Sequence, residues 1–296
     1  MAGRMTDLRC PVCAAPLTAG ERAFACAAGH SYDRARQGYV HLLRPTRLRG
    51  DAPEMLRARR RFFDAGWYAP LASALAAEVG AWLAAADGGA ALPPSARALL
   101  DAGCGEGYYL RTLAETLGPT LAEGGWRLYG LDLAKEAVRL AAARSGAAIW
   151  VVASVRDRLP FADGGVGALL SVFAPRHAEE FARVVAPGGL LLVAAPTEAH
   201  LAQARAALPW LLTPEPAKAE RLAATLEGVF ALEETRAVDF TLALDAAALA
   251  DLAEMTPHRA VAREALAAAA HVAAGGAPDG RLAVHVACLL RRYRRR

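Results

Sequence analysis

The sequence predicts an α/β protein in which a small N-terminal metal-binding ribbon precedes a domain with a seven-stranded, mostly parallel sheet. Two observations indicate this fold class. Three of the five cysteines lie close to a histidine near the start of the chain, and from about residue 96 short apolar runs alternate with helical patterns. Such alternation is typical of a parallel sheet that is covered on both faces. At 296 residues and 55% hydrophobic composition, the chain can bury a sizeable core.

The first element is the segment that carries Cys10, Cys13, Cys26 and His30. Two cysteines separated by two residues supply two corners of a tetrahedral zinc site, and Cys26 and His30 can supply the other two after a short hairpin. The alternatives are a disulfide and a Cys-x-x-Cys redox pair, although the segment is too short for a redox domain. Four protein ligands leave no open position on the metal. We therefore expect a structural zinc that supplies folding energy to the ribbon.

The beginning of the chain shows no export signal. Met1 is followed by polar residues and then by the cysteine pair, so we expect no signal peptide. Charged residues and prolines interrupt the alanine-rich stretches before about 18 apolar residues accumulate, so we expect no contact with a membrane. These features predict a cytoplasmic protein, and in that reducing compartment a disulfide is the poorer interpretation of the cysteines.

A basic segment follows the ribbon, with seven arginines from Arg44 to Arg61 and only two acids. Asp51 near the cap and acidic charge in the first turn predict a helix over 53–65. Arg57, Arg60 and Arg61 would then lie on adjacent turns, either as a phosphate-binding stripe or as a solvated helix face. The net charge is only +4, and five of the last six residues are arginines. Because the basicity is local, it favours phosphate binding.

The next part of the sequence, after a linker of alanine, glycine and proline near 87–95, alternates between strand and helix. Short apolar runs predict five buried strands, and helical patterns predict helices at 108–117 and 135–144. Two further runs near the C-terminus would form a hairpin-like pair that completes the seven-stranded sheet. The predicted strands cover residues 98–101, 127–132, 148–153, 167–173, 190–195, 228–244 and 280–290.

A glycine-rich loop follows the first of these strands. It contains Gly103, Gly105 and Gly107, with Asp101 before them, and Asp132 ends the second strand. Glycines let the backbone pass close to a ligand at the start of the next helix. The spacing Gly-x-Gly-x-Gly differs from the Gly-x-Gly-x-x-Gly of dinucleotide-binding proteins. A carboxylate at the end of the second strand can bind ribose hydroxyls, so we expect a nucleoside-containing ligand at this loop.

The sequence resembles the class I S-adenosylmethionine-dependent methyltransferases, which have a Rossmann-like domain. The resemblance rests on three features: the glycine loop led by Asp101, the acid at the end of the second strand, and the Pro187-Gly188-Gly189 turn before the fifth strand. The resemblance implies that Gly103 and Gly105 line the methionine end of the cofactor and that Asp132 holds its ribose. It further implies that adenine lies beside Ser154 and Val155. The full set of implied cofactor-binding residues is Asp101, Gly103, Gly105, Gly107, Tyr108, Asp132, Leu133, Ser154 and Val155.

A resemblance to the 23S rRNA guanine-N1-methyltransferases, the RlmA and tylosin-resistance type, covers about residues 8 to 290. It rests on the zinc segment and on six further segments, although residues 258–262 lack a tryptophan that the family pattern leads us to expect. The resemblance implies methylation of N1 of a guanine in hairpin 35, at nucleotide 745 or 748, and resistance to macrolide antibiotics. The six segments are 38–43, 54–60, 64–71, 101–109, 173–175 and 255–257.

The acceptor pocket is expected after the fourth strand, where Phe173, Pro175 and His177 are the candidates and Phe173 could stack on the target base or belong to the core. No residue stands out as the general base. The alternative functions are methylation of a small-molecule natural product and zinc-dependent RNA binding without catalysis. We expect a ribbon over 1–45, a basic helical connector over 46–95 and a methyltransferase domain over 96–296, with 23S rRNA as partner and a homodimer as the assembly.

Overall fold

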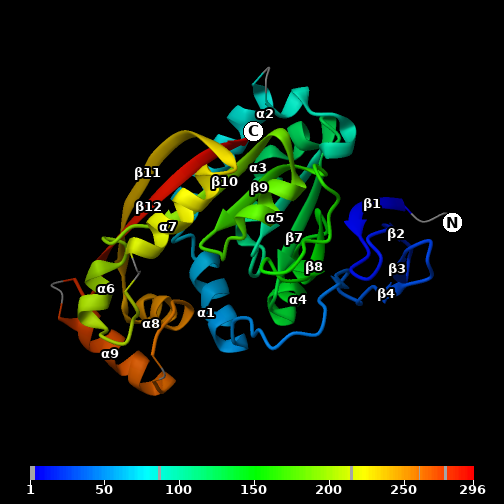
Figure 1. Ribbon diagram of the computed structural model, residues 1–296. Coiled ribbons are helices and arrows are strands. Elements are labelled where there is room, and N and C mark those ends of the chain that lie inside the picture. The colour runs from blue at the N-terminus through cyan, green and yellow to red at the C-terminus, as the bar shows by residue number, and fades with distance from the viewer. Residues whose placement is uncertain (1–3, 86–87, 214–215, 260, 277–278) are drawn as a thin grey trace.

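The computed structural model describes residues 4–85, 88–213, 216–259, 261–276 and 279–296. Its N-terminal part is a four-stranded antiparallel sheet with the strand order β1-β2-β3-β4, which lies to one side of the larger domain (Figure 1). The strands are short because turns interrupt them at the paired cysteines and at the glycines. Their bounds are β1 (Arg4–Arg9), β2 (Pro16–Ala19), β3 (Ala23–Ala25) and β4 (Ser31–Asp33).

A mostly parallel sheet forms the centre of the molecule and confirms the predicted fold class. Only the pairings that involve β12 are antiparallel. Strands β6 and β9 are buried along their whole length, as expected for a parallel sheet between two layers. In spatial order the strands are β11 (Phe230–Leu244), β12 (Leu282–Arg295), β10 (Val185–Pro196), β9 (Val166–Val172), β6 (Ala98–Ala102), β7 (Arg127–Asp132), β8 (Ala148–Val152) and β5 (Val40–His41).

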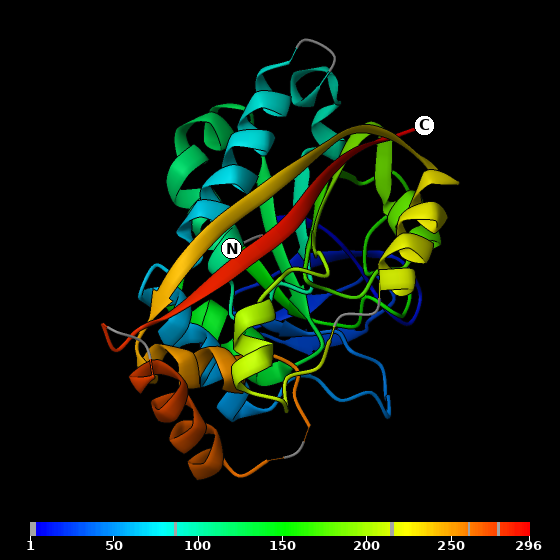
Figure 2. The same ribbon diagram turned by 90° about the vertical axis from the view of Figure 1, so that its left-hand side faces the viewer.

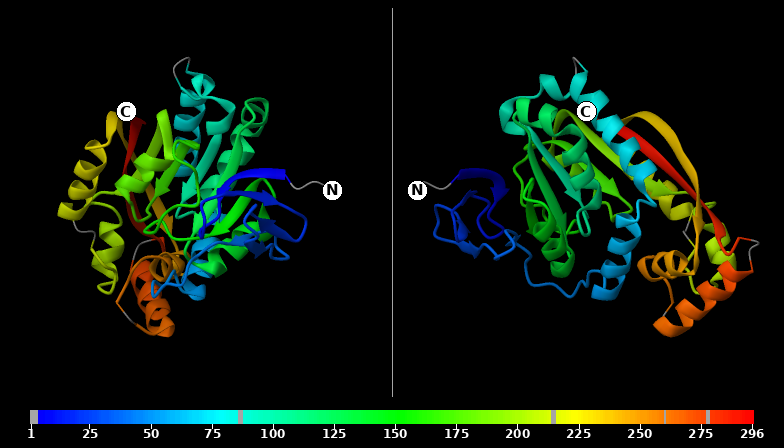
Figure 3. Two further views of the ribbon diagram at one scale, coloured as in Figure 1. Left: turned by 45° about the vertical axis from the view of Figure 1, so that its right-hand side comes forward. Right: turned by 180° about the vertical axis from the view of Figure 1, so that it is seen from behind.

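Two apolar layers cover the central sheet. One face packs against α2 (Ala69–Ala84), α3 (Tyr108–Glu123) and α4 (Lys135–Arg144). The other face packs against α5 (Ala178–Val184), α7 (Pro216–Glu227) and the N-terminal ribbon. Residues of the ribbon therefore share an apolar cluster with this face of the sheet, and Figure 3 shows the ribbon beside the central sheet from two further sides.

The remaining helices lie beyond the carboxyl edge of the sheet. Helix α1 (Pro53–Asp64) packs against α8 (Ala246–Met255), which in turn packs against α9 (Arg263–Gly275), and α6 (Ala202–Ala207) lies beside β12. Helix α1 matches the predicted helix to within one residue. Asp51 lies near the cap as expected, directly before Ala52 at the cap position, and its carboxylate pairs with Arg59 at 2.7 Å.

Two features of the sheet differ in detail from expectation. The eighth strand, β5, comes from the segment assigned to the ribbon, and two residues are too few for a recognisable strand pattern. The terminal pair β11 and β12 is antiparallel and long, but α8 and α9 connect its strands in place of a tight hairpin turn (Figure 2).

The expected linker near 87–95 lies partly outside the described residues, and 89–91 and 94–96 form short 3₁₀ turns. In the described ranges, no helix has the length and apolar character needed to cross a membrane.

Candidate functional site

The four predicted metal ligands meet at one point of the ribbon. Their ligand atoms all lie within 4.8 Å of one another. Cys13 Sγ lies 3.7 Å from Cys26 Sγ, and His30 Nδ1 lies 3.6 Å from Cys10 Sγ and 3.4 Å from Cys26 Sγ. Zn–S bonds of about 2.3 Å and Zn–N bonds of about 2.05 Å give tetrahedral edges of about 3.8 Å between sulfurs and about 3.6 Å between sulfur and nitrogen. The spacing therefore fits a structural zinc.

Backbone turns and neighbouring side chains hold this cluster in shape. The Ala14 N–H donates to the Cys10 carbonyl at 2.9 Å, and the Gly29 N–H donates to the Cys26 carbonyl at 3.0 Å, so each pair of ligands begins with a tight turn. The Tyr32 hydroxyl lies 3.1 Å from Cys10 Sγ. A hydroxyl that donates to a ligating sulfur orients that ligand. The cysteines are all free of disulfides, as the metal interpretation requires.

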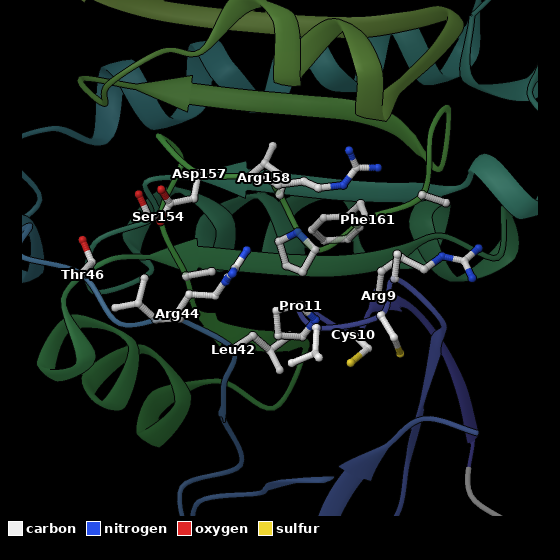
Figure 4. A pocket seen from close by; sticks show the side chains of 18 of the residues that line it. Arg9, Cys10, Pro11, Leu42, Arg44, Thr46, Ser154, Asp157, Arg158 and Phe161 are labelled. Atoms are coloured by element: carbon white, nitrogen blue, oxygen red, sulfur yellow. The ribbon is translucent and has the colours of Figure 1, made fainter. Parts of the chain in front are cut away.

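Specific contacts fix the ribbon to the central domain. The Asp7 carboxylate accepts hydrogen bonds from Arg127 Nε at 2.5 Å and from the Tyr129 hydroxyl at 2.8 Å. The Arg9 N–H donates to the Pro160 carbonyl at 2.8 Å. These contacts leave a cavity of about 1100 Å³ between the ribbon and the loop that follows β8 (Figure 4).

The cofactor loop bends sharply after β6 and is held from the second strand. The N–H groups of Gly103 and Cys104 both donate to the Leu131 carbonyl, at 2.8 and 3.0 Å. Gly103 has φ +88°, and a Cβ there would lie 2.5 Å from the Ala174 Cβ, so glycine is needed for the close approach of the loop that follows β9. Gly105 has φ +55°, but a Cβ there would meet only Arg59 Nη1, at 3.5 Å. Gly105 therefore faces open space, as a ligand-facing position should.

Asp132 has a second role that the sequence did not reveal. Its Oδ2 accepts the Gly105 N–H at 2.9 Å, and its Oδ1 accepts the Ala134 N–H at 2.8 Å. The carboxylate thus holds the glycine loop, and each oxygen keeps a further lone pair for a ribose hydroxyl. Burial raises the pKa of Asp132, and these two backbone donors oppose the rise.

Asp101 lies beneath the loop as a buried acid without a partner. Its side chain is 1% exposed, and neither oxygen has a hydrogen-bond partner. Burial, together with the negative charge of Asp132, raises the pKa of Asp101 to about 7. Buried polar atoms are usually paired, so an unpaired carboxyl group in this loop fits a site completed by a polar ligand such as the ammonium of S-adenosylmethionine.

The remaining predicted cofactor residues fall into two groups. Leu133, Ser154 and Val155 follow the ends of β7 and β8, where the Ser154 hydroxyl accepts the Arg156 N–H at 3.1 Å. Ser154 also lines the cavity beneath the ribbon. The Tyr108 ring, however, stacks on Phe63 of α1 with ring centroids 4.6 Å apart. Tyr108 lies at the start of α3, directly after Gly107.

Arg59 belongs to this site, although the sequence directed attention to its neighbours. Its Nη1 lies close to the open side of Gly105 and pairs with Asp51, and its Nη2 donates to the Met255 carbonyl at 3.4 Å. A guanidinium there can bind a carboxylate. Arg59 differs from Arg57, Arg60 and Arg61 only in the direction in which its side chain leaves α1. The sequence at the start of the helix did not define that direction.

The three arginines of the predicted stripe remain at the surface, but each has an acidic partner. Arg57 pairs with Glu54 at 2.6 Å, and Arg60 pairs with Asp64 at 3.7 Å. Arg61 pairs with Asp251 of α8. Exposed pairs of this kind contribute little stability, yet they reduce the positive charge that the helix offers to phosphates.

The candidate acceptor residues lie at the end of β9. Phe173 is 38% exposed and has φ +52°, a left-handed conformation that is uncommon for a bulky residue. Its ring packs edge-on against Tyr68, with centroids 6.2 Å apart, and at a tilt against His200, with centroids 5.7 Å apart. The structure therefore holds an exposed aromatic ring in a fixed orientation. Pro175 is also exposed, whereas His177 precedes α5 and its Nδ1 is buried without a partner.

His200 also contacts this loop, and no sequence motif around it indicated such a role. The Ala287 N–H lies 3.4 Å from Nδ1, so Nδ1 accepts and Nε2 carries the proton that it donates to the Tyr68 hydroxyl at 3.4 Å. Burial lowers the pKa of His200 to about 4. His200 is therefore neutral, and it supports Phe173 and Tyr68 from behind.

A glycine loop after the first strand of a mostly parallel sheet, held by an acid at the end of the next strand, is typical of the S-adenosylmethionine-dependent methyltransferases. Comparison with known protein families supports this class. Residues 8–47 match the N-terminal zinc ribbon of RlmA, and residues 100–193 match a methyltransferase domain. The cofactors of this protein are S-adenosylmethionine and a structural zinc.

Similar proteins define the family more narrowly. The 23S rRNA (guanine(748)-N(1))-methyltransferase of Streptomyces fradiae is 41% identical over 251 residues, which cover 84% of each chain. A protein of Micromonospora griseorubida, provisionally described as a 23S rRNA (guanine-N1)-methyltransferase, is 43% identical over 235 residues, or 75% of this chain and 76% of that one. A Bacillus subtilis protein with the same provisional description is 30% identical and covers 67% of both chains. The chain belongs to the 23S rRNA (guanine-N1)-methyltransferase family.

Proposed function

We propose that this protein transfers a methyl group from S-adenosylmethionine to N1 of a guanine in hairpin 35 of 23S rRNA. The observation that carries the proposal is the 41% identity, over 84% of both chains, with an enzyme named for guanine 748. We extend to this chain the target nucleotide, 748 or the nearby 745, and a role in macrolide resistance. An enzyme that acts on ribosomal RNA works in the cytoplasm, and a homodimer remains a prediction.

Each part of the cofactor has a proposed binding group in the chain. The cofactor supplies a methyl group on a sulfonium. Gly103 and Gly105 line the methionine end, and the Arg59 guanidinium binds the carboxylate there. Asp132 binds the ribose, and Ser154 with Val155 lies beside adenine. Because methyl transfer needs alignment more than bond polarisation, positioning by these residues supplies most of the rate.

The acceptor side must hold a guanine that has left its base stack. Enzymes that modify bases extrude the target and stack it on aromatic or apolar side chains. Phe173 is suited to this task because it is exposed and is fixed from behind by Tyr68 and His200. Stacking between a base and an aromatic ring contributes about 1–3 kcal/mol. Guanine N1 also loses a proton, and His177 and ordered water are the routes we propose for it.

RNA contacts are proposed on two surfaces. Arg9 and Arg44 line the cavity beneath the ribbon, and neither forms an ion pair with any described acid. Arg57, Arg60 and Arg61 form the second surface, where their acidic partners would have to exchange for phosphates. We therefore expect the cavity arginines to contribute more to RNA affinity than the arginines of α1.

Incubation with labelled S-adenosylmethionine and a transcript of hairpin 35 tests the function. Methylation at N1 blocks Watson–Crick pairing, so primer extension should stop at the modified guanine. Transcripts with adenine in place of guanine 745 or guanine 748 assign the position. Incorporation into a macrolide but not into the transcript would favour the small-molecule alternative and overturn the proposal.

A further inference from the structure

Buried polar side-chain atoms without a hydrogen-bond partner fall into two main groups in the described part of the chain. One group surrounds the cofactor loop and includes both oxygens of Asp101. The second consists of Ser171 Oγ, Arg176 Nε, His177 Nδ1 and the Tyr293 hydroxyl. Native proteins leave few buried polar groups unpaired, so a cluster of them marks a place that another molecule completes. Of this second group, the methyl transfer proposed above uses only His177, and it assigns no role to Ser171, Arg176 or Tyr293.

The sheet register brings these side chains together beside the acceptor loop. Val193 of β10 pairs with Ser171 of β9 on one side and with Arg291 of β12 on the other. Residues directly opposite one another project from the same face, so Ser171 and Arg291 share a face two residues before Phe173. Tyr293 projects from that face because it lies two residues after Arg291. Arg176 enters the same region from the loop between Phe173 and α5, because its charge interacts with Tyr293 and Arg291.

The cluster holds positive charge that no described acid neutralises through an ion pair. Burial lowers the pKa of Arg176, and the neighbouring charge of Arg291 lowers it further. Burial raises the pKa of the Tyr293 hydroxyl, and the negative charge of Glu227 raises it further. The positive charges of Arg291 and Arg176 oppose this rise. Arg292, the next residue along β12, shows the contrast, since it pairs with Glu78 at 3.1 Å and with Glu234 at 3.0 Å.

We propose that the guanidinium groups of Arg176 and Arg291 form a binding site for one phosphate of the RNA backbone. Arginine presents donors in a planar fork that matches phosphate oxygens. A phosphate would neutralise two mutually repelling guanidinium groups, whereas the Ser171 and Tyr293 side chains are buried beneath them, at 0% and 1% exposure.

The place of the site in the fold indicates which phosphate binds. Arg176 lies three residues after Phe173, on the loop that carries the proposed base-stacking residue. A phosphate bound here would belong to the extruded nucleotide or its direct neighbour, and it would fix the backbone while the base reaches the cofactor. This inference rests on the proposed function, because it takes an RNA strand as the occupant.

Two variants test the site, Arg176→Met and Arg291→Met, which keep the apolar stem of each arginine and remove its charge. Arg139→Met is the matched control, because Arg139 is paired with Glu136 at 2.7 Å on α4. The dissociation constant for fluorescent hairpin 35 RNA is measured across a salt series. Calorimetry gives the cofactor affinity, and thermal unfolding gives Tm.

Each cluster variant should weaken RNA binding about 10- to 150-fold, the range for a lost charge-assisted hydrogen bond. The slope of log affinity against log salt should flatten by about 0.7–0.9 for the one lost phosphate contact. Cofactor affinity should be unchanged, and Tm should be unchanged or higher because a repulsion has been removed. RNA affinity equal to that of Arg139→Met would overturn the inference, and a fall in Tm alone would assign the cluster a structural role.

Two further outcomes separate this site from the rest of the enzyme. A parallel loss of cofactor affinity in the cluster variants would show that the bound anion is the cofactor carboxylate, which overturns the phosphate assignment. Failure of the wild-type protein to methylate the transcript would refute the proposed function, while the binding comparison would still decide whether Arg176 and Arg291 hold a phosphate.

Discussion

Replacement of Gly105 by alanine separates the two reasons why a glycine occupies this loop. Gly105 has φ +55°, and its open side meets only the flexible end of Arg59. A left-handed conformation costs a residue with a Cβ about 1–2 kcal/mol, which lowers Tm by about 2–8 °C in a domain of this size. The fold should therefore survive, and any larger effect must come from the ligand.

The added methyl group would occupy space that we assign to the methionine end of the cofactor. Overpacking by one methyl group costs about 1–3 kcal/mol, so the dissociation constant for S-adenosylmethionine should rise about 5- to 150-fold in Gly105→Ala. The matched control is Gly188→Ala. Gly188 has φ +76°, and a Cβ there would meet nothing within 4 Å. It lies in the turn within β10, away from the cofactor loop.

Isothermal titration calorimetry of both variants gives the result directly, with unfolding curves to compare their stability. Both should lose similar stability, but only Gly105→Ala should lose cofactor affinity. Equal affinity in the two variants would refute the assignment of Gly105 to the cofactor.

Three further predictions follow from the site. Cys13→Ser should lower the zinc content, which atomic absorption should find to be about one per chain in the wild type, and it should also lower Tm. Cys288→Ser should keep the full zinc content. Retained zinc in Cys13→Ser would exclude Cys13 as a ligand. Asp101 has an unfolded pKa of 3.8 and a folded pKa of about 7, so its contribution to stability is complete below pH 4 and is lost as the pH rises towards 7. Denaturant titrations should show a smaller loss in Asp101→Asn, and an unchanged profile would contradict the raised pKa. Arg59→Met should weaken S-adenosylmethionine binding about 10- to 150-fold, while Arg57→Met should leave it unchanged; equal affinities would remove Arg59 from the site.

The features that the sequence predicted well depend on residues close together along the chain. The zinc ligands span about twenty residues, and the glycine loop lies next to its own acid, Asp101. Turns bring such residues together whatever the rest of the fold does. The strand predicted over 190–195 lies within β10, because a buried strand is a continuous apolar run, but β10 begins earlier, at Val185, and includes the expected Pro187-Gly188-Gly189 turn.

The features that the sequence did not predict depend on contacts between distant segments. Arg59 differs from Arg60 only in the side of α1 from which it projects, and the packing of α1 against the glycine loop determines that side. His200 supports Phe173 only because β12 brings the Ala287 N–H to its ring. The partner of Asp51 was not foreseen for the same reason, since the fold brings the Arg59 guanidinium to its carboxylate.

The attachment of β5 to the edge of the central sheet has a consequence for the order of events during synthesis. Val40 pairs with Val151, more than a hundred residues later in the chain. At 5–20 residues per second, the ribbon leaves the ribosome about 6–20 s before the strand on which it docks exists. During that interval the central sheet does not yet exist to stabilise the ribbon. Metal binding is then the available source of folding energy for so small a unit. The zinc therefore acts first as a folding cofactor for the nascent chain, and cells short of zinc should lose this enzyme while it is being made.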